Sequence, residues 1–147
     1  MLYFFDTMLY RDFLQQRTGC PFCDPNEYKF IEDEYAFLSY SLAPYHKHHL
    51  LVIPKRHHLS LFDINEKEKA SIDNLISKGM RILKDLGYIN FTLLAREGDN
   101  NGKSVPHIHW HLVPDTDIGV MGPTHHSRSI MTPDEIAETI RDISDKI

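Results

Sequence analysis

The run SVPHIHWHLVP, residues 104–114, alternates histidine with apolar side chains. Successive side chains of a β-strand point to opposite faces of a sheet. We therefore expect His107, His109 and His111 to share one face, while the intervening Ile108, Trp110 and Leu112 share the other. The pattern predicts a strand with a chemically active face and a core face.

Elsewhere the apolar positions recur at the spacing of a helix. A long stripe runs from Ile72 to Leu86 and is flanked by Asn65, with Glu68 in a capping-box position, and by Gly87. This pattern predicts one long helix. The acidic and basic residues at 66–70 indicate that its first turn is solvated.

The two ends of the chain also carry helical patterns. Thr132 is suited to cap a helix that begins at Pro133, so we expect a C-terminal helix over residues 132–146. Leu9 and Phe13 continue an apolar spacing that begins at Leu2, which predicts an N-terminal helix over residues 1–18.

Strand patterns fill much of the remaining sequence. Two aromatic-rich segments, 28–33 and 35–41, predict a hairpin, and 49–55 predicts a strand that ends near Pro54. Residues 89–96 and 107–114 flank a turn rich in glycine and asparagine and predict a second hairpin. Residues 115–129 lack a period and are expected to form a loop. No internal repeat is evident, so we expect a single α+β domain over residues 1–147.

Composition narrows the classes of function. The chain has 147 residues, 41% of them hydrophobic and 25% charged, which is typical of a globular domain. Its net charge of −5 and pI near 6.0 give no general attraction for nucleic acid. Charged residues at 6, 11 and 12 interrupt the apolar start, so we expect neither a signal peptide nor a membrane span, and a cytoplasmic location.

Histidine and cysteine are the candidates for chemistry. One histidine on a strand is usually structural, but three on one face need partners, which would be a metal ion, a substrate or one another. Cys20 and Cys23 in GCPFCD are too close in sequence for the disulfide framework of a secreted domain. They indicate either a metal-binding knuckle or a redox pair.

Several segments together resemble the histidine triad (HIT) superfamily. HIHWHLVP resembles its His-x-His-x-His signature, and HLLVIPKRH at 49–57 resembles a second family segment. The EG at 97–98 and the GKSV at 102–105 match the layout of Hint-type members, while CPFC stands where zinc-containing bacterial members carry Cys-x-x-Cys. The resemblance covers roughly residues 20 to 114 (the HIT core).

The resemblance implies a fold and a reaction. The fold would be a five-stranded antiparallel sheet, usually paired across a two-fold axis in a homodimer, and the ligand a nucleotide or dinucleoside polyphosphate. By family position His109 would attack the α-phosphorus and form a nucleotidyl-histidine. His111 would donate to a phosphate oxygen or to the leaving group, His49 would orient the site, and Ser104 would hydrogen-bond the phosphate or leaving group.

The same resemblance assigns a structural zinc site. Its four ligands would be Cys20, Cys23, His57 and His107, a closed tetrahedral set. The neighbouring His58 is an alternative to His57. In this interpretation His107 serves the metal, while His109 and His111 serve the phosphate.

Departures from the family pattern concern the substrate. Ser41 replaces a carboxylate that commonly holds the ribose, and we group it with Leu42 as substrate-binding. Arg96 and Lys103 replace two neutral amides near the phosphates. We therefore expect a preference for highly anionic substrates over simple nucleoside phosphoramidates.

Two other functions remain open from the residues alone. The same replacements are compatible with a non-catalytic nucleotide-binding or regulatory protein, and the triad would also suit a metal-dependent hydrolase.

We interpret His46 and His48 as surface-loop residues. His125, His126 and Arg128 lie where a loop would reach a long substrate.

Overall fold

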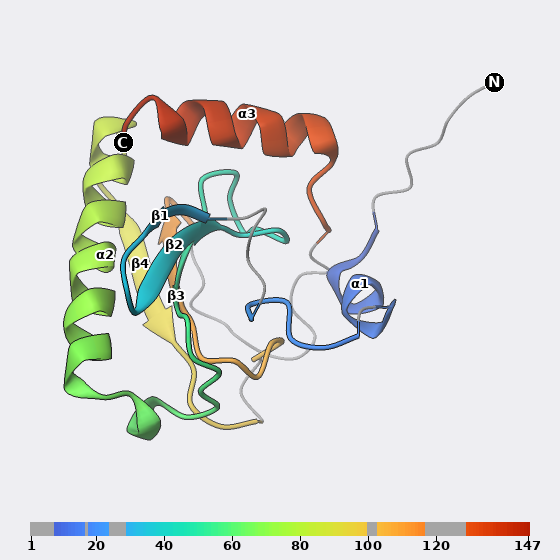
Figure 1. Cartoon of the computed structure of the whole chain (residues 1–147). Helices are drawn as coiled ribbons and strands as arrows, with labels where there is room; N and C mark the ends of the chain where they lie inside the picture. The colour runs from blue at the N-terminus through green and yellow to red at the C-terminus, as the bar shows by residue number, and fades with distance from the viewer. Residues whose placement is uncertain (1–7, 17, 24–28, 100–102, 117–128) are drawn as a thin grey trace.

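A five-stranded antiparallel sheet forms the centre of the computed structural model, which describes residues 8–16, 18–23, 29–99, 103–116 and 129–147 (Figure 1). The spatial order of its strands is β1-β2-β3-β5-β4. The strands are β1 (Lys29–Glu32), β2 (Ala36–Tyr40), β3 (Leu50–Pro54), β4 (Phe91–Ala95) and β5 (Trp110–Pro114). The expected α+β class and five-stranded sheet are thus confirmed.

Both predicted hairpins are present, but the histidine strand is shorter than predicted. β1 pairs with β2 and β4 pairs with β5, while β3 lies between the two hairpins. β5 begins only at Trp110, so His107 and His109 precede it. The reason is that regular pairing with β3 ends at Val52 opposite Trp110, beyond which the Ile108 N–H donates to the carbonyl of His58 instead.

The long helix follows its sequence signals closely. α2 (Glu66–Asp85) is capped by Asn65 and has the full capping box with Glu68. Gly87 follows the helix with a φ of 101°, a conformation that favours glycine. One detail of the prediction is wrong: Glu68 belongs to the charged run that was expected to be solvated, but its side chain is buried.

The other two helices are shorter than predicted. α3 (Pro133–Ser144) is capped by the Thr132 hydroxyl and lies across one end of the sheet (Figure 1). α1 (Tyr10–Gln16) lies on the opposite side of the sheet from α2. Leu9 is not helical, because it forms an antiparallel bridge with Ser129, and residues 1–7 lie outside the described part.

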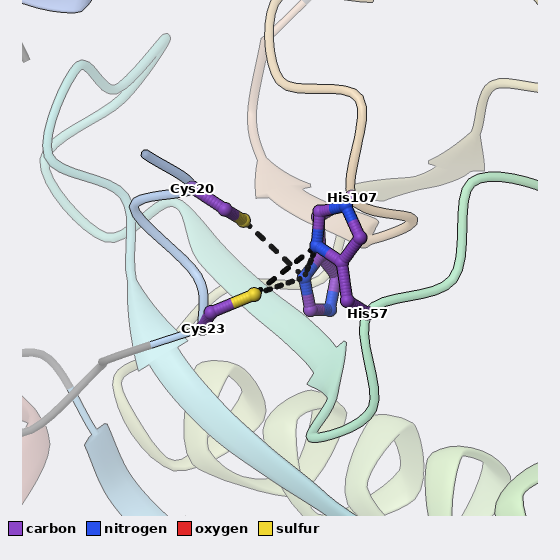
Figure 2. Close-up of side chains that lie close together, drawn as sticks. All are labelled: Cys20, Cys23, His57 and His107. Atoms are coloured by element: carbon purple, nitrogen blue, oxygen red, sulfur yellow. Dashed lines mark hydrogen bonds between the residues drawn. The ribbon is translucent and has the colours of Figure 1, made fainter. Parts of the chain in front are cut away.

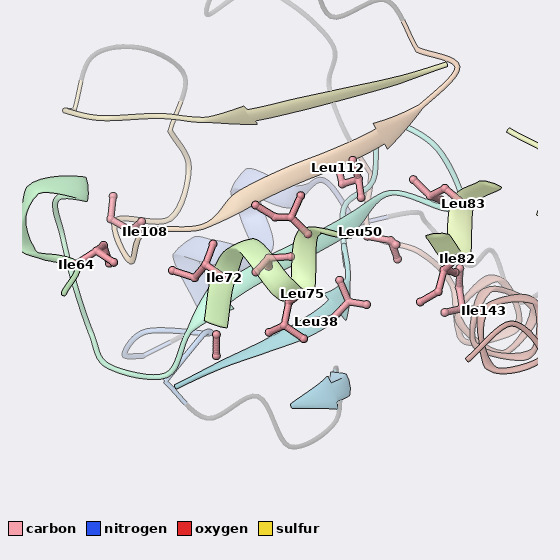
Figure 3. Close-up of a cluster of buried hydrophobic side chains, with 13 residues drawn as sticks. Leu38, Leu50, Ile64, Ile72, Leu75, Ile82, Leu83, Ile108, Leu112 and Ile143 are labelled. Carbon is pink, nitrogen blue, oxygen red and sulfur yellow. The ribbon is translucent and has the colours of Figure 1, made fainter. Parts of the chain in front are cut away.

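The main hydrophobic core lies between α2 and the sheet (Figure 3). Leu38, Leu50 and Leu112 from three neighbouring strands meet Leu75 of α2 there. A Cβ at Gly79 would lie 3.0 Å from a methyl carbon of Leu112, so the glycine permits the close approach of α2 to the sheet. Trp110 packs at the margin of this cluster.

The predicted loop at 115–129 lies largely outside the described residues, and so do His125, His126 and Arg128. Within the described segments, we find no helix that is both long and apolar enough to cross a membrane.

Candidate functional site

β5 and the segment before it bring the three triad histidines into two adjoining clusters. All three side chains are buried. His107 faces the cysteines, whereas the rings of His109 and His111 lie 4.6 Å apart. Phe22 packs edge-on against both His107 and His109 and so contacts both clusters.

The first cluster contains Cys20, Cys23, His57 and His107, which converge in Figure 2. Nδ1 of His107 lies 3.4 Å and 3.6 Å from the two sulfurs, and 3.2 Å from Nδ1 of His57. Nδ1 of His57 lies 3.1 Å from Sγ of Cys23. These are the four residues that the sequence grouped as metal ligands, with His57 rather than His58 in the group.

Hydrogen bonding explains why this cluster suits a cation. The Nε2–H of His107 donates to the carbonyl of Pro54 at 2.7 Å, so its Nδ1 presents a lone pair to the cluster. Tetrahedral zinc with ordinary bond lengths would place sulfur and nitrogen ligands about 3.6 Å apart and two nitrogens about 3.3 Å apart. The observed spacings agree with those values, so the donor set fits a four-coordinate ion.

The acid–base properties of the cluster point the same way. Burial lowers the pKa of His107 to about 4, against the opposing effect of its bond to Pro54, so the imidazole stays neutral. Burial and the adjacent Cys20 thiol raise the pKa of Cys23 to about 11. A neutral His107 imidazole beside a Cys23 thiol that resists ionisation is an arrangement in which a bound cation would stabilise the thiolate form.

The second cluster contains the candidate nucleophile. The Nδ1–H of His109 donates to the carbonyl of His107 at 2.8 Å, which leaves the lone pair on Nε2. Burial, assisted by the positive charges of Arg96 and Lys103, lowers the pKa of His109 to about 4, against the opposing effect of its bond to the carbonyl of His107. His109 is therefore neutral near pH 7, as a nucleophilic imidazole has to be.

A chain of hydrogen bonds ends beside His109. The backbone N–H of Tyr45 donates to Nδ1 of His49 at 3.2 Å, and Nε2 of His49 lies 2.9 Å from Nδ1 of His111. Nε2 of His111 then lies 3.2 Å from a guanidinium nitrogen of Arg96. The structure thus brings His49, His111 and Arg96 together, as expected for residues of one site.

The remaining predicted residues lie around this centre. Ser41 and Leu42 line an open pocket, together with Phe22 and the aromatic side chains of α1. Lys103 donates from Nζ to the carbonyl of Leu59 at 3.2 Å. Ser104 is partly buried and follows residues 100–102, which lie outside the described part.

Two buried polar clusters were missed from the sequence. His48, expected on the surface, is buried with its ring nitrogens 2.6 Å from the Tyr88 hydroxyl and 2.8 Å from the Asp142 carboxylate. His58 is buried against Glu68 at 2.7 Å. Their partners lie on distant elements, and the only local signal was an unusual density of histidine at 46–49 and 57–58.

The structure combines an antiparallel sheet, one long covering helix and an alternating histidine run that is shared between a cysteine cluster and the neutral imidazole of His109. The HIT domain family model matches residues 25–118. The chain belongs to the HIT domain family.

Individual relatives are distant. An uncharacterized HIT-like protein of Methanocaldococcus jannaschii is 29% identical over 83 residues, which is 56% of this chain and 64% of that protein, so the match spans less than two thirds of its length. The adenosine 5'-monophosphoramidase hnt1 of Schizosaccharomyces pombe is 29% identical over 123 residues, 81% of this chain and 87% of that protein. The crystal structure of a Zn-bound histidine triad family protein from Mycobacterium smegmatis is 20% identical, with a TM-score of 0.63 over 93% of this chain and 90% of that one.

Proposed function

We propose that this protein is a nucleotide hydrolase or nucleotidyltransferase that acts through a covalent nucleotidyl-His109 intermediate. The observation that carries the proposal is the tautomer of His109. Its Nδ1–H donates to a backbone carbonyl, which leaves the lone pair on Nε2, its low pKa keeps it neutral, and its ring centroid lies 4.6 Å from that of His111. Membership of the HIT family and the relative named as a monophosphoramidase support nucleotide chemistry.

The proposed reaction has two steps. Nε2 of His109 donates its lone pair to the α-phosphorus, forming a P–N bond while the bond to the leaving group breaks and its electron pair departs with that group. Water or another acceptor then attacks the phosphorus through its oxygen and releases its proton to solvent, while the P–N bond breaks and its electron pair returns to Nε2. His111 stabilises charge on the phosphate, and His49 holds His111 in position. We also place Ser104 at the phosphate, by family position.

The pocket beside Phe22 is the proposed nucleoside site. Its aromatic side chains offer faces on which a base can stack, and Phe22 joins it to His109. Ser41 offers a hydroxyl and Leu42 an apolar contact at the position expected for the ribose. A dinucleoside polyphosphate would extend from this pocket past His109 toward Arg96 and Lys103.

We further propose that the first cluster holds a structural zinc ion. Bound zinc would supply no reactive position, because all four of its sites would be filled by Cys20, Cys23, His57 and His107. Its effect would be to join the segment at 20–23, which includes Phe22, to the segment that carries His109. The Zn-bound family structure supports this choice of metal.

A homodimer paired along β4 is also part of the proposal. Phe91 and Leu93 stand opposite Pro114 and Leu112, yet they are 36% and 47% exposed, because α2 packs on β2, β3 and β5 instead. β4 ends the order of strands, so its outer edge can pair with a second copy about a two-fold axis.

The decisive experiment is a labelling assay. The protein is incubated with a nucleotide carrying radioactive phosphorus at the α-position, then denatured and analysed. We expect acid-labile, base-stable label on the wild type and on the His46→Asn control, whose ring packs against Tyr88 rather than against the triad. His109→Ala should carry none. Labelling of His109→Ala at the wild-type level would refute the assignment, and nucleotide binding without turnover by the wild type would favour a regulatory protein.

A further inference from the structure

The hydrogen-bond chain beside His109 fixes where its protons lie. A backbone N–H can only donate, so the bond from Tyr45 requires a lone pair on Nδ1 of His49. Neutral His49 then carries its proton on Nε2 and donates it to Nδ1 of His111. Neutral His111 must in turn carry its own proton on Nε2, on the side that faces Arg96.

This assignment brings two donors face to face. A guanidinium group has no acceptor, so the 3.2 Å approach between Arg96 and Nε2 of His111 cannot be a hydrogen bond between the two groups in this tautomer. Because the two nitrogens lie only 3.2 Å apart, one oxygen anion placed beside them could accept from both groups. Charge-assisted bonds of this kind are strong, and a guanidinium group is well shaped for phosphate.

The position of Arg96 also bears on the leaving group. An amine leaves a phosphoramidate only after it gains a proton, whereas a phosphate leaves as an anion. A second positive charge on His111 would be repelled by Arg96 at this distance, which disfavours proton delivery from His111. The arrangement therefore favours stabilisation of a departing anion over protonation of a departing amine.

We propose that Arg96 and His111 form an anion-holding pair that binds the leaving phosphate of a nucleoside polyphosphate and so makes Arg96 a specificity-determining residue. The inference rests on the proposed function of the site. In the reaction, the bond between the α-phosphorus and the bridging oxygen breaks, and its electron pair stays on that oxygen in the departing phosphate. No proton has to be transferred to it.

Lys103 does not form the same arrangement. Its ammonium group donates to the carbonyl of Leu59, although its charge also acts on His109. Arg96 is thus the cation that this geometry brings against the histidine relay.

The test compares two substrates that share a nucleoside. Diadenosine triphosphate has ADP as its leaving group, and adenosine 5'-phosphoramidate has an amine. Arg96→Gln should lower kcat/KM for the polyphosphate by about 10- to 100-fold, the range for losing a hydrogen bond to a charged group, and leave the phosphoramidate within about threefold. Arg96→Lys should restore part of the loss. Arg81→Gln removes the same charge from an exposed position on α2 and should change neither substrate.

A binding measurement keeps the two proposals separable. Calorimetric titration with inorganic pyrophosphate should show binding to the wild type that is at least about tenfold weaker in Arg96→Gln, with circular dichroism confirming that the variant is folded. Equal loss for both substrates, or equal pyrophosphate affinity, would overturn the anion-holding pair while leaving nucleotide hydrolysis intact. A wild type that turns over neither substrate would instead overturn the proposed function. The pyrophosphate titration would still test whether Arg96 and His111 hold an anion.

Discussion

Removing Glu68 should destabilise the protein severely, because this carboxylate is buried and holds three segments together. Its oxygens accept from the ring of His58 at 2.7 Å and from the backbone N–H of Asn65 at 3.2 Å. The exposed fractions of the His58 and Glu68 side chains are 7% and 1%. The carbonyl of His58 also accepts from the N–H of Ile108 at 2.8 Å, so the pair connects α2 to the triad segment.

The expected magnitude follows from these contacts. Glu68→Ala would remove a capping arm and leave the His58 imidazole buried without its carboxylate. Leaving a buried donor without its partner costs about 1–3 kcal/mol, and losing part of a helix cap costs about 1 kcal/mol more, so the total loss is about 2–4 kcal/mol. At roughly 2–4 °C per kcal/mol for a chain of this size, the thermal midpoint should fall by about 4–16 °C.

Urea unfolding is the suitable assay, because Trp110 is the single tryptophan of the chain and lies in β5 beside the affected segment. Glu66→Ala is the matched control: it removes the same group from the same helical turn, where the side chain is 91% exposed. We expect the control to cost less than about 1 kcal/mol. A loss for Glu68→Ala no larger than that of the control would refute the reasoning.

Three further predictions concern the metal, the nucleophile and the dimer. Elemental analysis should find one zinc per chain in the wild type and in His109→Ala, and a strongly reduced content in Cys20→Ser; equal zinc in both variants would contradict the ligand set. Because the neutral form of His109 reacts and burial lowers its pKa from 6.5 to about 4, kcat/KM should stay level as pH falls through 6.5 and halve only near 4; half-maximal activity at 6.5 would contradict this. Phe91→Asp should shift sedimentation from dimer to monomer, whereas Lys84→Asp on exposed α2 should not; a dimer in both would place the interface elsewhere.

The helices and hairpins that the sequence predicts correctly are those whose physical signal is local. The capping box of Asn65 and Glu68 and the proline that opens α3 act within a few residues, so their helices were found with accurate starts. The two hairpins were found because turn-forming residues separate short apolar segments. The family motifs grouped the catalytic candidates into one expected site, which the periodicity of the sequence alone does not indicate.

The errors share one cause, which is that a distant partner decides the outcome. Glu68 has the local pattern of a solvated helical turn, but the ring of His58 packs against its carboxylate and buries it. His48 has the pattern of a polar loop, but Tyr88 and Asp142 come from elements at least 40 residues away. The alternation through residue 107 could not show that the pairing of β5 stops at Trp110, because beyond it the Ile108 N–H donates to the carbonyl of His58, a residue outside β3.

The triad shows that the identity of the residues does not by itself define a mechanism. Three histidines at alternate positions offer six ring nitrogens, and the sequence does not say which of them carry protons. The fold assigns them through neighbours: Pro54 takes the Nε2–H of His107, the carbonyl of His107 takes the Nδ1–H of His109, and the relay from Tyr45 leaves the proton of His111 on Nε2. The lone pairs therefore face the cysteine cluster at His107 and the proposed phosphate site at His109, while His111 presents a donor. One alternating pattern thus presents two lone pairs and one N–H donor in different directions, which suit the proposed ligand, nucleophile and anion donor, because each ring has a different backbone or side-chain partner.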